Sequence, residues 1–231
     1  TCLFHAAAGG VGLLFGQWAA SIGATAIGTV SSAEKAQLAK DHGYAHVINY
    51  SEENVLDRVM DITGGEKLPV VYDGVGKDTF FLSLDCLRPR GLMVSFGNAS
   101  GAPEPLDLQE LSNRGSLFIT RPTMLSYTAT PDELRQSSDD LFAKILCADI
   151  RVEINQRYAL ADVQQAHRDL QARKTTGSTV LVPWCWSGRA FASSRCLRSM
   201  HRAFTVAVGL SRIGPICPGP VLSMPLTCAT G

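Results

Sequence analysis

Short apolar runs alternate with amphipathic stretches over the first 118 residues of the chain. The apolar runs predict strands over residues 3–5, 24–30, 47–50, 69–73, 91–96 and 117–120. Between them, apolar residues that recur every three or four positions predict helices over residues 11–22, 34–42, 52–63 and 78–87. This alternation is typical of an α/β fold in which a doubly wound parallel sheet is flanked by crossover helices.

Residues that begin and end helices support these boundaries. Ser32 is a suitable N-cap for the second helix, and a glycine follows the last residue of three helices, at Gly23, Gly43 and Gly64. The first helix carries apolar side chains around its whole circumference, so we expect it to be largely buried.

The pattern after residue 118 predicts helices over residues 131–146 and 160–172 and strands over residues 150–158 and 180–182. We therefore divide the chain into three parts. Residues 1–118 form a doubly wound unit, residues 119–183 form a shorter segment that lacks a partner layer, and residues 184–231 form a tail of different composition.

The tail differs from the rest of the chain in charge and in cysteine content. The whole chain is neutral, with 21 basic and 21 acidic residues, but all acids lie before residue 184 and the tail adds only five arginines. Four of the seven cysteines also lie in the tail. The tail resembles the product of out-of-frame translation, and we expect it to be disordered or frameshifted. Its dispersed arginines do not favour nucleic-acid binding.

Composition excludes several classes of protein. With 45% hydrophobic and 18% charged residues, the chain is an ordinary globular sequence rather than a disordered or fibrous one. Its longest apolar stretch, residues 203–226, is interrupted by an arginine and four prolines, so no membrane span is expected. Seven unpatterned cysteines argue against a disulfide scaffold or a zinc ribbon, and we expect no metal site and a cytoplasmic location.

A glycine-rich turn joins the first predicted strand to the first predicted helix. Ala7, Gly9 and Gly12 have the spacing of the dinucleotide-binding fingerprint of Rossmann-type folds. Glycines allow the backbone to approach a pyrophosphate, and free N–H groups at the start of the helix bind the anion. We therefore predict cofactor contacts at Ala8, Gly9, Gly10 and Val11, although such a turn can also serve packing alone.

The end of the second strand distinguishes NADP from NAD. NAD-binding sites carry an acidic residue there for the ribose 2′-hydroxyl, whereas this chain places small hydroxyl side chains and a lysine in the region. These side chains suit a 2′-phosphate and predict NADP(H) as the cofactor. The predicted contacts are Thr29, Ser31, Ser32 and Lys35. In the alternative interpretation, Ser31 and Ser32 only cap the next helix and Lys35 is solvated.

Two further turns follow the fourth and fifth strands, at residues 73–76 and 96–101. Ligands of open α/β sheets bind outside the carboxyl ends of the strands, so we expect both turns to line the cofactor cleft. The predicted contacts are Val75, Phe96, Gly97 and Asn98. The alternative is that both are tight turns without ligand contacts.

Several segments together resemble a known family. They are residues 5–12, 47–50, 72–76, 84–97, 120–122 and 174–178. The chain is similar over residues 1–183 to the zinc-independent quinone oxidoreductases of the medium-chain dehydrogenase/reductase superfamily. The resemblance implies binding of NADPH, hydride transfer to a small quinone and no zinc. It also implies a homodimer of the full-length protein.

The resemblance adds site residues that local pattern does not supply. It implies that Lys35, Tyr50 and Arg173 surround the 2′-phosphate, and that segments 96–99 and 118–121, including Phe118 and Thr120, lie beside the nicotinamide. No catalytic acid or base is assigned, because the cofactor itself carries the hydride chemistry.

The chain also departs from the family pattern. Nothing before Thr1 corresponds to the GroES-like catalytic domain with which members begin, so residues 119–183 are expected to form the C-terminal segment of an incomplete GroES-like domain. We therefore expect a fragment of such an enzyme. The alternatives are a catalytically inactive NADPH-binding module and another zinc-independent enoyl or double-bond reductase of the superfamily.

Overall fold

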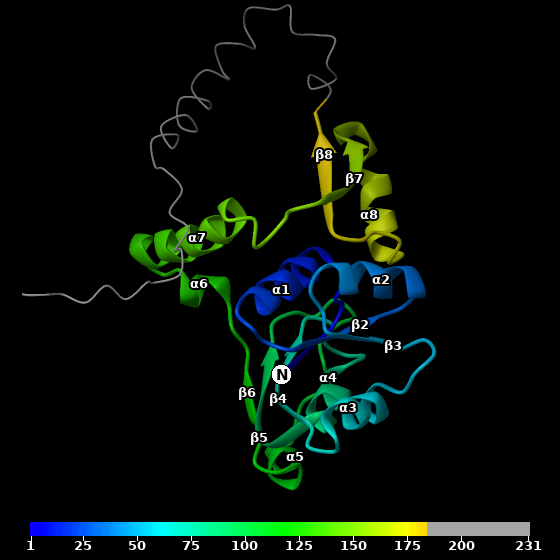
Figure 1. Cartoon of the computed structure of the whole chain (residues 1–231), viewed down its shortest axis with the longest axis vertical. Coiled ribbons are helices and arrows are strands. Elements are labelled where there is room, and N and C mark those ends of the chain that lie inside the picture. The colour runs from blue at the N-terminus through cyan, green and yellow to red at the C-terminus, as the bar shows by residue number, and fades with distance from the viewer. Residues whose placement is uncertain (184–231) are drawn as a thin grey trace, which may run out of the picture.

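The computed structural model describes residues 1–183, which form a six-stranded sheet with flanking helices and a separate two-stranded sheet (Figure 1). The larger sheet consists of β1 (Cys2–Phe4), β2 (Ala26–Val30), β3 (His46–Asn49), β4 (Leu68–Asp73), β5 (Leu87–Ser95) and β6 (Phe118–Thr120). Its strands pair in parallel in the order β3-β2-β1-β4-β5-β6. This is the order of a doubly wound sheet, the fold class that the sequence predicts, and its switch point lies between β1 and β4.

Five helices accompany this sheet. They are α1 (Gly10–Ser21), α2 (Ala33–Asp41), α3 (Val55–Thr63), α4 (Phe80–Asp85) and α5 (Leu108–Asn113). Neighbouring strand residues belong to two different cores, because Leu3 packs in the core that includes Val59 of α3 and Leu84 of α4, whereas Phe4 packs in the core that includes Ala19 of α1. Both faces of the sheet are therefore covered, which explains why its strands are almost continuously apolar.

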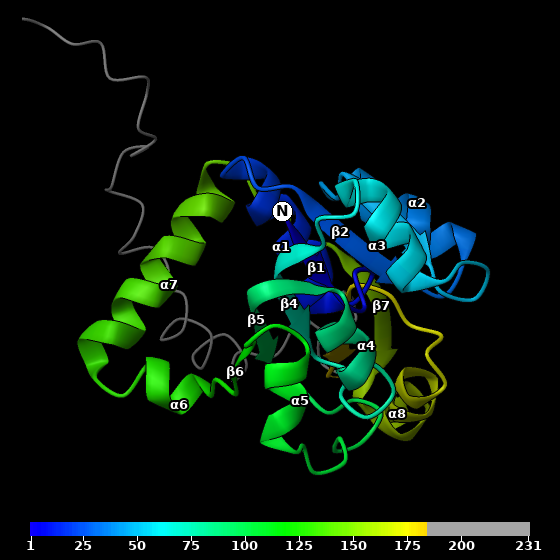
Figure 2. The same cartoon turned by 90° about the horizontal axis from the view of Figure 1, so that it is seen from below.

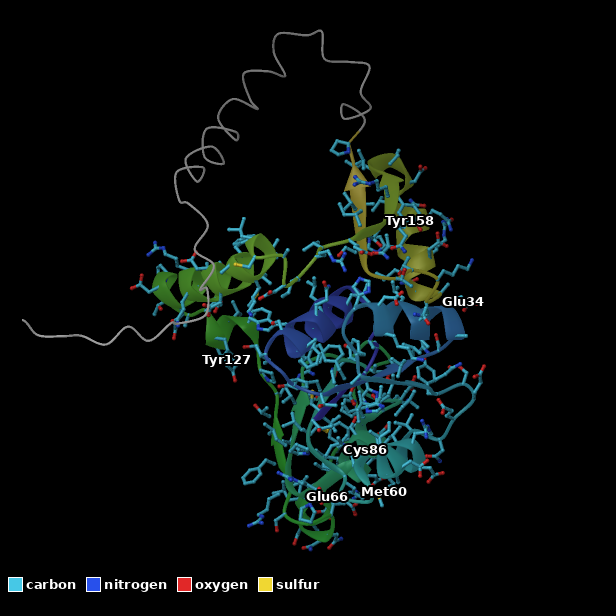
Figure 3. The ribbon with its side chains drawn as sticks, viewed as in Figure 1. Glu34, Met60, Glu66, Cys86, Tyr127 and Tyr158 are labelled. Atoms are coloured by element: carbon cyan, nitrogen blue, oxygen red, sulfur yellow. The ribbon has the colours of Figure 1, made fainter. Side chains whose placement is uncertain are left out.

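The core beside α3 and α4 contains one cysteine. Figure 3 shows Cys86 among the side chains next to these helices, and its side chain is fully buried. Burial raises the pKa of the Cys86 thiol to about 12, so this side chain behaves as a small apolar core residue.

The first helix is less buried than its composition predicts. Gly12, Leu13 and Ala19 face the sheet, but Val11 and Ile22 are 63% and 65% exposed. The prediction of a largely buried α1 was therefore wrong at both ends of the helix: Phe15 in its middle packs against Phe4, but Val11 and Ile22 face outward.

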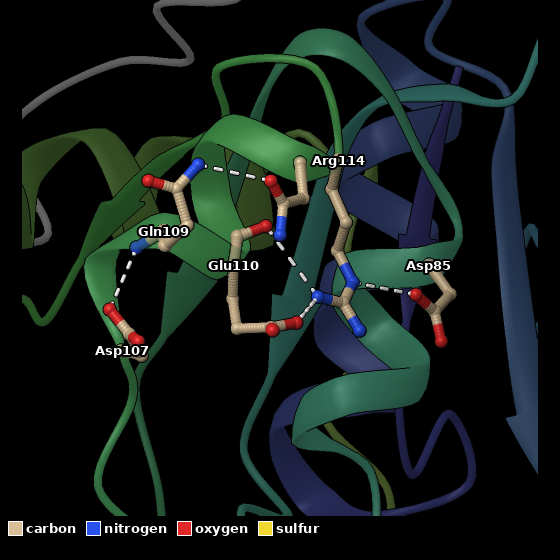
Figure 4. Close-up of polar contacts among 6 residues, drawn as sticks. Asp85, Asp107, Gln109, Glu110 and Arg114 are labelled. Atoms are coloured by element: carbon tan, nitrogen blue, oxygen red, sulfur yellow. Dashed lines mark hydrogen bonds and ion pairs between the residues drawn. The ribbon is translucent and has the colours of Figure 1, made fainter.

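One helix begins later than the pattern predicts, and one helix was not predicted. The helix α3 begins at Val55 rather than residue 52, because the Asn54 side chain accepts hydrogen bonds from the backbone N–H groups of Leu56 and Asp57. The sequence analysis did not predict α5, whose single pair of turns is too short to show a helical period. Asp107 caps α5, and Arg114 just beyond it forms ion pairs with Asp85 and Glu110 (Figure 4).

The remaining described elements follow β6. They are α6 (Met124–Tyr127), α7 (Pro131–Leu146), β7 (Ile154–Ala159), a 3-10 turn (Leu160–Asp162), α8 (Val163–Gln171) and β8 (Ser178–Val182). The strands β7 and β8 pair in parallel, and α8 connects them. Figures 1 and 2 show this unit well away from α7, which lies on the other side of the molecule.

The segment before β7 is shorter as a strand than predicted. Residues 150–153 do not pair in a sheet, because the Gln17 side chain of α1 bonds both the backbone N–H and the carbonyl of Arg151. Ile150 is buried beside this contact. The link therefore runs along α1 and brings the β7–α8–β8 unit to the same helix whose N-terminus follows the glycine-rich turn.

Other predictions concern the ends of the domains. The strand β6 crosses the predicted boundary after residue 118 and belongs to the large sheet through Thr120. The assignment of residues 119–183 to a GroES-like domain stays a prediction. The predicted tail, residues 184–231, lies outside the described residues.

Within residues 1–183, no helix is long and apolar enough to cross a membrane.

Candidate cofactor-binding site

The glycine-rich turn packs closely against the start of α1. A Cβ on Gly12 would lie 2.5 Å from the carbonyl oxygens of both Ala6 and Ala7, so only glycine fits there without displacing the backbone. Gly9 is the N-cap and provides no side chain, and the first N–H groups of α1 have no acceptor within the helix. The turn therefore presents backbone donors and the positive end of the helix dipole at the switch point.

A distant segment lies along this turn. The backbone N–H of Gly177 donates to the carbonyl of Ala8 at 2.9 Å, and Gly9 and Gly177 form a parallel bridge. A Cβ on Gly10 would lie 3.2 Å from the Gly177 carbonyl oxygen. The residues between α8 and β8 thus contact the turn that is predicted to bind the pyrophosphate. This contact was not predicted from the sequence.

Two predicted basic residues meet near the end of β2. The Lys35 ammonium donates to the backbone carbonyl of Arg173 at 2.8 Å and lies 3.5 Å from the Ser31 hydroxyl. The Arg173 guanidinium is exposed and lies 3.6 Å from a carboxylate oxygen of Asp78. The fold therefore joins α2 to the segment after α8 through the Lys35 side chain, while the Arg173 guanidinium pairs with Asp78 beyond β4.

The neighbouring strand end completes this region. The backbone N–H of Tyr50 donates to the carbonyl of Val30, which places Tyr50 beside the end of β2 with a half-exposed ring. The Ser32 hydroxyl accepts from the Lys35 backbone N–H, so Ser32 caps α2 as the alternative interpretation expected.

Thr29 is placed differently from the other predicted residues. Its side chain is 1% exposed and its hydroxyl lies 3.0 Å from Nδ1 of His5, while its carbonyl accepts from Ala7. Because both of its polar oxygens are used inside the protein, we leave Thr29 out of the proposed site.

The turns after β4 and β5 are bonded to each other. The backbone N–H groups of Ala99 and Ser100 donate to the carbonyls of Gly74 and Val75 at 3.2 and 2.8 Å. A Cβ on Gly97 would lie 2.5 Å from the Gly74 carbonyl oxygen. The two turns therefore form one hydrogen-bonded and closely packed unit at the carboxyl edge of the sheet.

Side chains of this unit lie at different depths. The ring of Phe96 packs over Gly74 and lies 5.6 Å from the ring of Phe4, while Asn98 is exposed. On β6, Phe118 is 60% exposed and Thr120 is partly buried. Contacts of these residues with a nicotinamide stay predictions.

The sequence analysis overlooked two groups of polar side chains beneath these turns. Arg121, just after β6, donates to the carbonyls of Ser95 and Gly97 at 2.9 and 3.1 Å. Below the turn after β4, His5 bonds Ser83, and Ser83 bonds the fully buried Asp73. A histidine at the end of a buried strand was the only local signal of the second group.

The described residues offer little else that suggests chemistry. Across residues 1–183, no group of three or more His, Cys, Asp and Glu side chains could hold a metal ion. A hollow of about 300 Å³ lies at the opposite edge of the sheet, among residues such as Thr25, His46 and Pro69. Because it is far from the switch point, it is not part of the candidate site.

Known proteins share this fold and sequence. A family model described as zinc-binding dehydrogenase matches residues 10–141. The quinone oxidoreductase of Pseudomonas aeruginosa is 60% identical over 183 residues, which are 79% of this chain and 56% of that protein. The 2-haloacrylate reductase of a Burkholderia species is 44% identical over 182 residues, which are 78% of this chain and 55% of that protein.

A solved structure is similar to this chain in both sequence and fold. The crystal structure of Escherichia coli quinone oxidoreductase complexed with NADPH is 52% identical with a TM-score of 0.77, over 79% of this chain and 56% of that one. This chain spans about half the length of the relatives it matches. It belongs to the zinc-binding dehydrogenase family, as a relative of the quinone oxidoreductases within it.

Proposed function

We propose that this chain carries the cofactor-binding unit of an NADPH-dependent quinone oxidoreductase. One observation carries the proposal: the Lys35 ammonium binds the backbone carbonyl of Arg173, which brings the segment after α8 to the end of β2, next to a glycine-rich turn that suits a pyrophosphate. The relatives named quinone oxidoreductase, and the E. coli structure complexed with NADPH, support this assignment.

The residues present fit this cofactor. The N–H groups of Gly10 and Val11 at the start of α1 would hold the pyrophosphate. Lys35, Arg173 and the hydroxyls of Ser31 and Tyr50 would hold the 2′-phosphate, whose charge the lysine and the arginine neutralise. NADPH, when bound, supplies a hydride to the substrate.

The opposite side of the cleft would orient the nicotinamide. Val75, Gly97 and Asn98 lie on the paired turns at the carboxyl ends of β4 and β5, and the ring of Phe96 packs over Gly74 beside them. We assign Phe118 and Thr120 of β6 to the same end. Rigid turns at this position favour the reaction by holding one ring face in a fixed direction.

The acceptor and the assembly lie beyond the cofactor-binding unit. We propose a small quinone as the acceptor, on the strength of the relatives' names. Because the Burkholderia relative is a 2-haloacrylate reductase, an activated carbon–carbon double bond is the second candidate. A homodimer of the full-length protein and a cytoplasmic location stay predictions of the sequence.

Titration of the 231-residue chain with NADPH and NADH tests the proposal. We expect NADPH to bind more tightly than NADH. We expect Lys35→Ala to weaken NADPH binding by about ten-fold without affecting NADH binding, because only NADPH carries the 2′-phosphate that Lys35 would contact. The control is Lys40→Ala, which removes an exposed lysine from the last turn of the same helix. Equal affinities for the two cofactors in the wild-type chain would contradict the proposal.

A second measurement concerns turnover. Oxidation of NADPH on addition of a soluble quinone would show the activity itself, and the same assay with 2-haloacrylate compares the two acceptors. Binding of NADPH without oxidation by either acceptor would favour the NADPH-binding module over an active enzyme.

A further inference from the structure

A buried chain of hydrogen bonds joins the two walls of the candidate cleft. His5 follows β1 and begins the glycine-rich turn, and Asp73 ends β4 on the other side of the switch point. Nε2 of His5 lies 3.0 Å from the Ser83 hydroxyl of α4, and this hydroxyl donates to Asp73 at 2.7 Å. All three side chains are at most 2% exposed.

The donors and acceptors in this chain can be assigned from chemistry. The single hydroxyl proton of Ser83 is directed to the Asp73 carboxylate, so Ser83 can only accept from His5, and Nε2 must carry a proton. Burial lowers the pKa of His5, which favours a neutral ring whose Nδ1 accepts from the Thr29 hydroxyl at 3.0 Å. The chain therefore runs in one direction, from Thr29 through His5 and Ser83 to Asp73.

The Asp73 carboxylate also binds the backbone of the turn that follows β4. One of its carboxylate oxygens accepts from the N–H groups of Val75 and Gly76 at 2.8 and 3.0 Å, and Thr79 donates to both oxygens. The turn held in this way carries the hydrogen bonds to Ala99 and Ser100 described above. The orientation of one carboxylate thus sets the backbone of both turns.

We propose that His5 is a positioning residue for the nicotinamide side of the cofactor site. It acts through Ser83 and Asp73, it touches no cofactor itself, and it fixes the turns that carry Val75, Gly97 and Asn98. This inference rests on the proposed binding of NADPH. The 2′-phosphate end is assembled from other contacts, chiefly that of Lys35 with the backbone of Arg173, so the effect of His5 should be largest on the nicotinamide half of the cofactor.

The test compares ligands that occupy different parts of the site. The full 231-residue chain and its variants are titrated with NADPH and with 2′,5′-ADP, which lacks the nicotinamide half. We expect His5→Ala to weaken NADPH binding by about ten-fold, because it leaves buried polar groups unpaired, and to change binding of 2′,5′-ADP by less than about two-fold. Ser83→Ala interrupts the same chain with a smaller change in volume and should give the same division.

A conservative variant and matched controls separate positioning from general damage. His5→Gln retains one N–H donor and one acceptor, so it should recover most of the NADPH affinity that His5→Ala loses. His46→Gln and Ser137→Ala make comparable changes at exposed positions and should bind both ligands as the wild type does. Thermal unfolding followed by circular dichroism shows which variants are folded at the temperature of the titration.

The outcomes distinguish this inference from the proposed function. If the wild-type chain binds neither NADPH nor 2′,5′-ADP, the proposed function is wrong, and His5 has no cofactor to position. If the wild type binds both, the inference is overturned when folded Ser83→Ala binds NADPH normally, or when it loses both ligands equally. Failure of His5→Gln to improve on His5→Ala would also count against it.

Discussion

The buried imidazole of His5 predicts a measurable dependence of stability on pH. Its side chain is 2% exposed and both ring nitrogens are engaged by hydroxyl groups, one of which has already directed its proton to Asp73. A second proton on the ring would therefore lie in a desolvated site and face the Thr29 hydroxyl, which would have to turn from donor to acceptor. Burial accordingly lowers the pKa of His5 in the folded state.

The sign and size of the effect follow from proton linkage. A histidine whose pKa is lowered by folding binds its proton more readily in the unfolded chain, so stability is complete at high pH and falls as the pH drops below the ordinary imidazole pKa of about 6.5. One pH unit below that value, the loss approaches about 1.4 kcal/mol if the folded ring stays neutral. His5→Gln has no ionisable group and should lack this contribution.

Urea unfolding at several pH values between about 5.5 and 7.5 measures the effect. The quantity of interest is the difference in unfolding free energy between the wild type and His5→Gln at each pH, since the other histidines cancel. We expect this difference to shrink by about 1 kcal/mol from the highest to the lowest pH. His46→Gln, which removes an exposed imidazole, should run parallel to the wild type. A constant difference for His5→Gln would refute the assignment of a neutral, buried ring.

Two further substitutions and one labelling experiment test the packing and capping of the fold. Gly12→Ala should lower the unfolding free energy by about 1–3 kcal/mol, because the new methyl group meets two backbone carbonyl oxygens. An unchanged midpoint of urea unfolding would contradict this packing argument. Cys86 should resist iodoacetamide in the folded chain and react once it is unfolded, as peptide mass mapping would show, since its thiol is buried with a pKa of about 12. Asn54→Ala should lower the unfolding free energy by about 1 kcal/mol through loss of the α3 cap, as measured by urea unfolding. An unchanged midpoint would show that this cap does not stabilise the fold.

Much of the sheet could be predicted from the sequence, because burial on both faces requires apolar residues that are visible as local patterns. Strands that pack against helices on either side are apolar at most positions, and helices that cover them are apolar on one stripe. The glycine spacing predicted the turn before α1, and the structure supplies the reason at Gly12. The same reasoning overestimated the burial of Val11 and Ile22, because composition does not tell which side of a helix meets the sheet.

The local pattern did not predict the contacts that make the candidate site. The pairing of Lys35 with Arg173 joins residues 138 positions apart, and the bond from His5 to Ser83 joins residues 78 positions apart. The resemblance to known proteins supplied Tyr50 and Arg173, whereas nothing in the sequence pattern indicated the seat of Gly177 on the turn or the role of Asp73.

The sequence by itself determined the kind of fold and the position of its glycine-rich turn, because both depend on residues within one strand, turn or helix. The tertiary structure decided which charges meet, which polar side chains are buried and which turns are locked together. Those contacts depend on the order of strands in the sheet and on the path of the chain after α8. Strand order is set by the packing of the whole domain, and no local period of apolar residues records it.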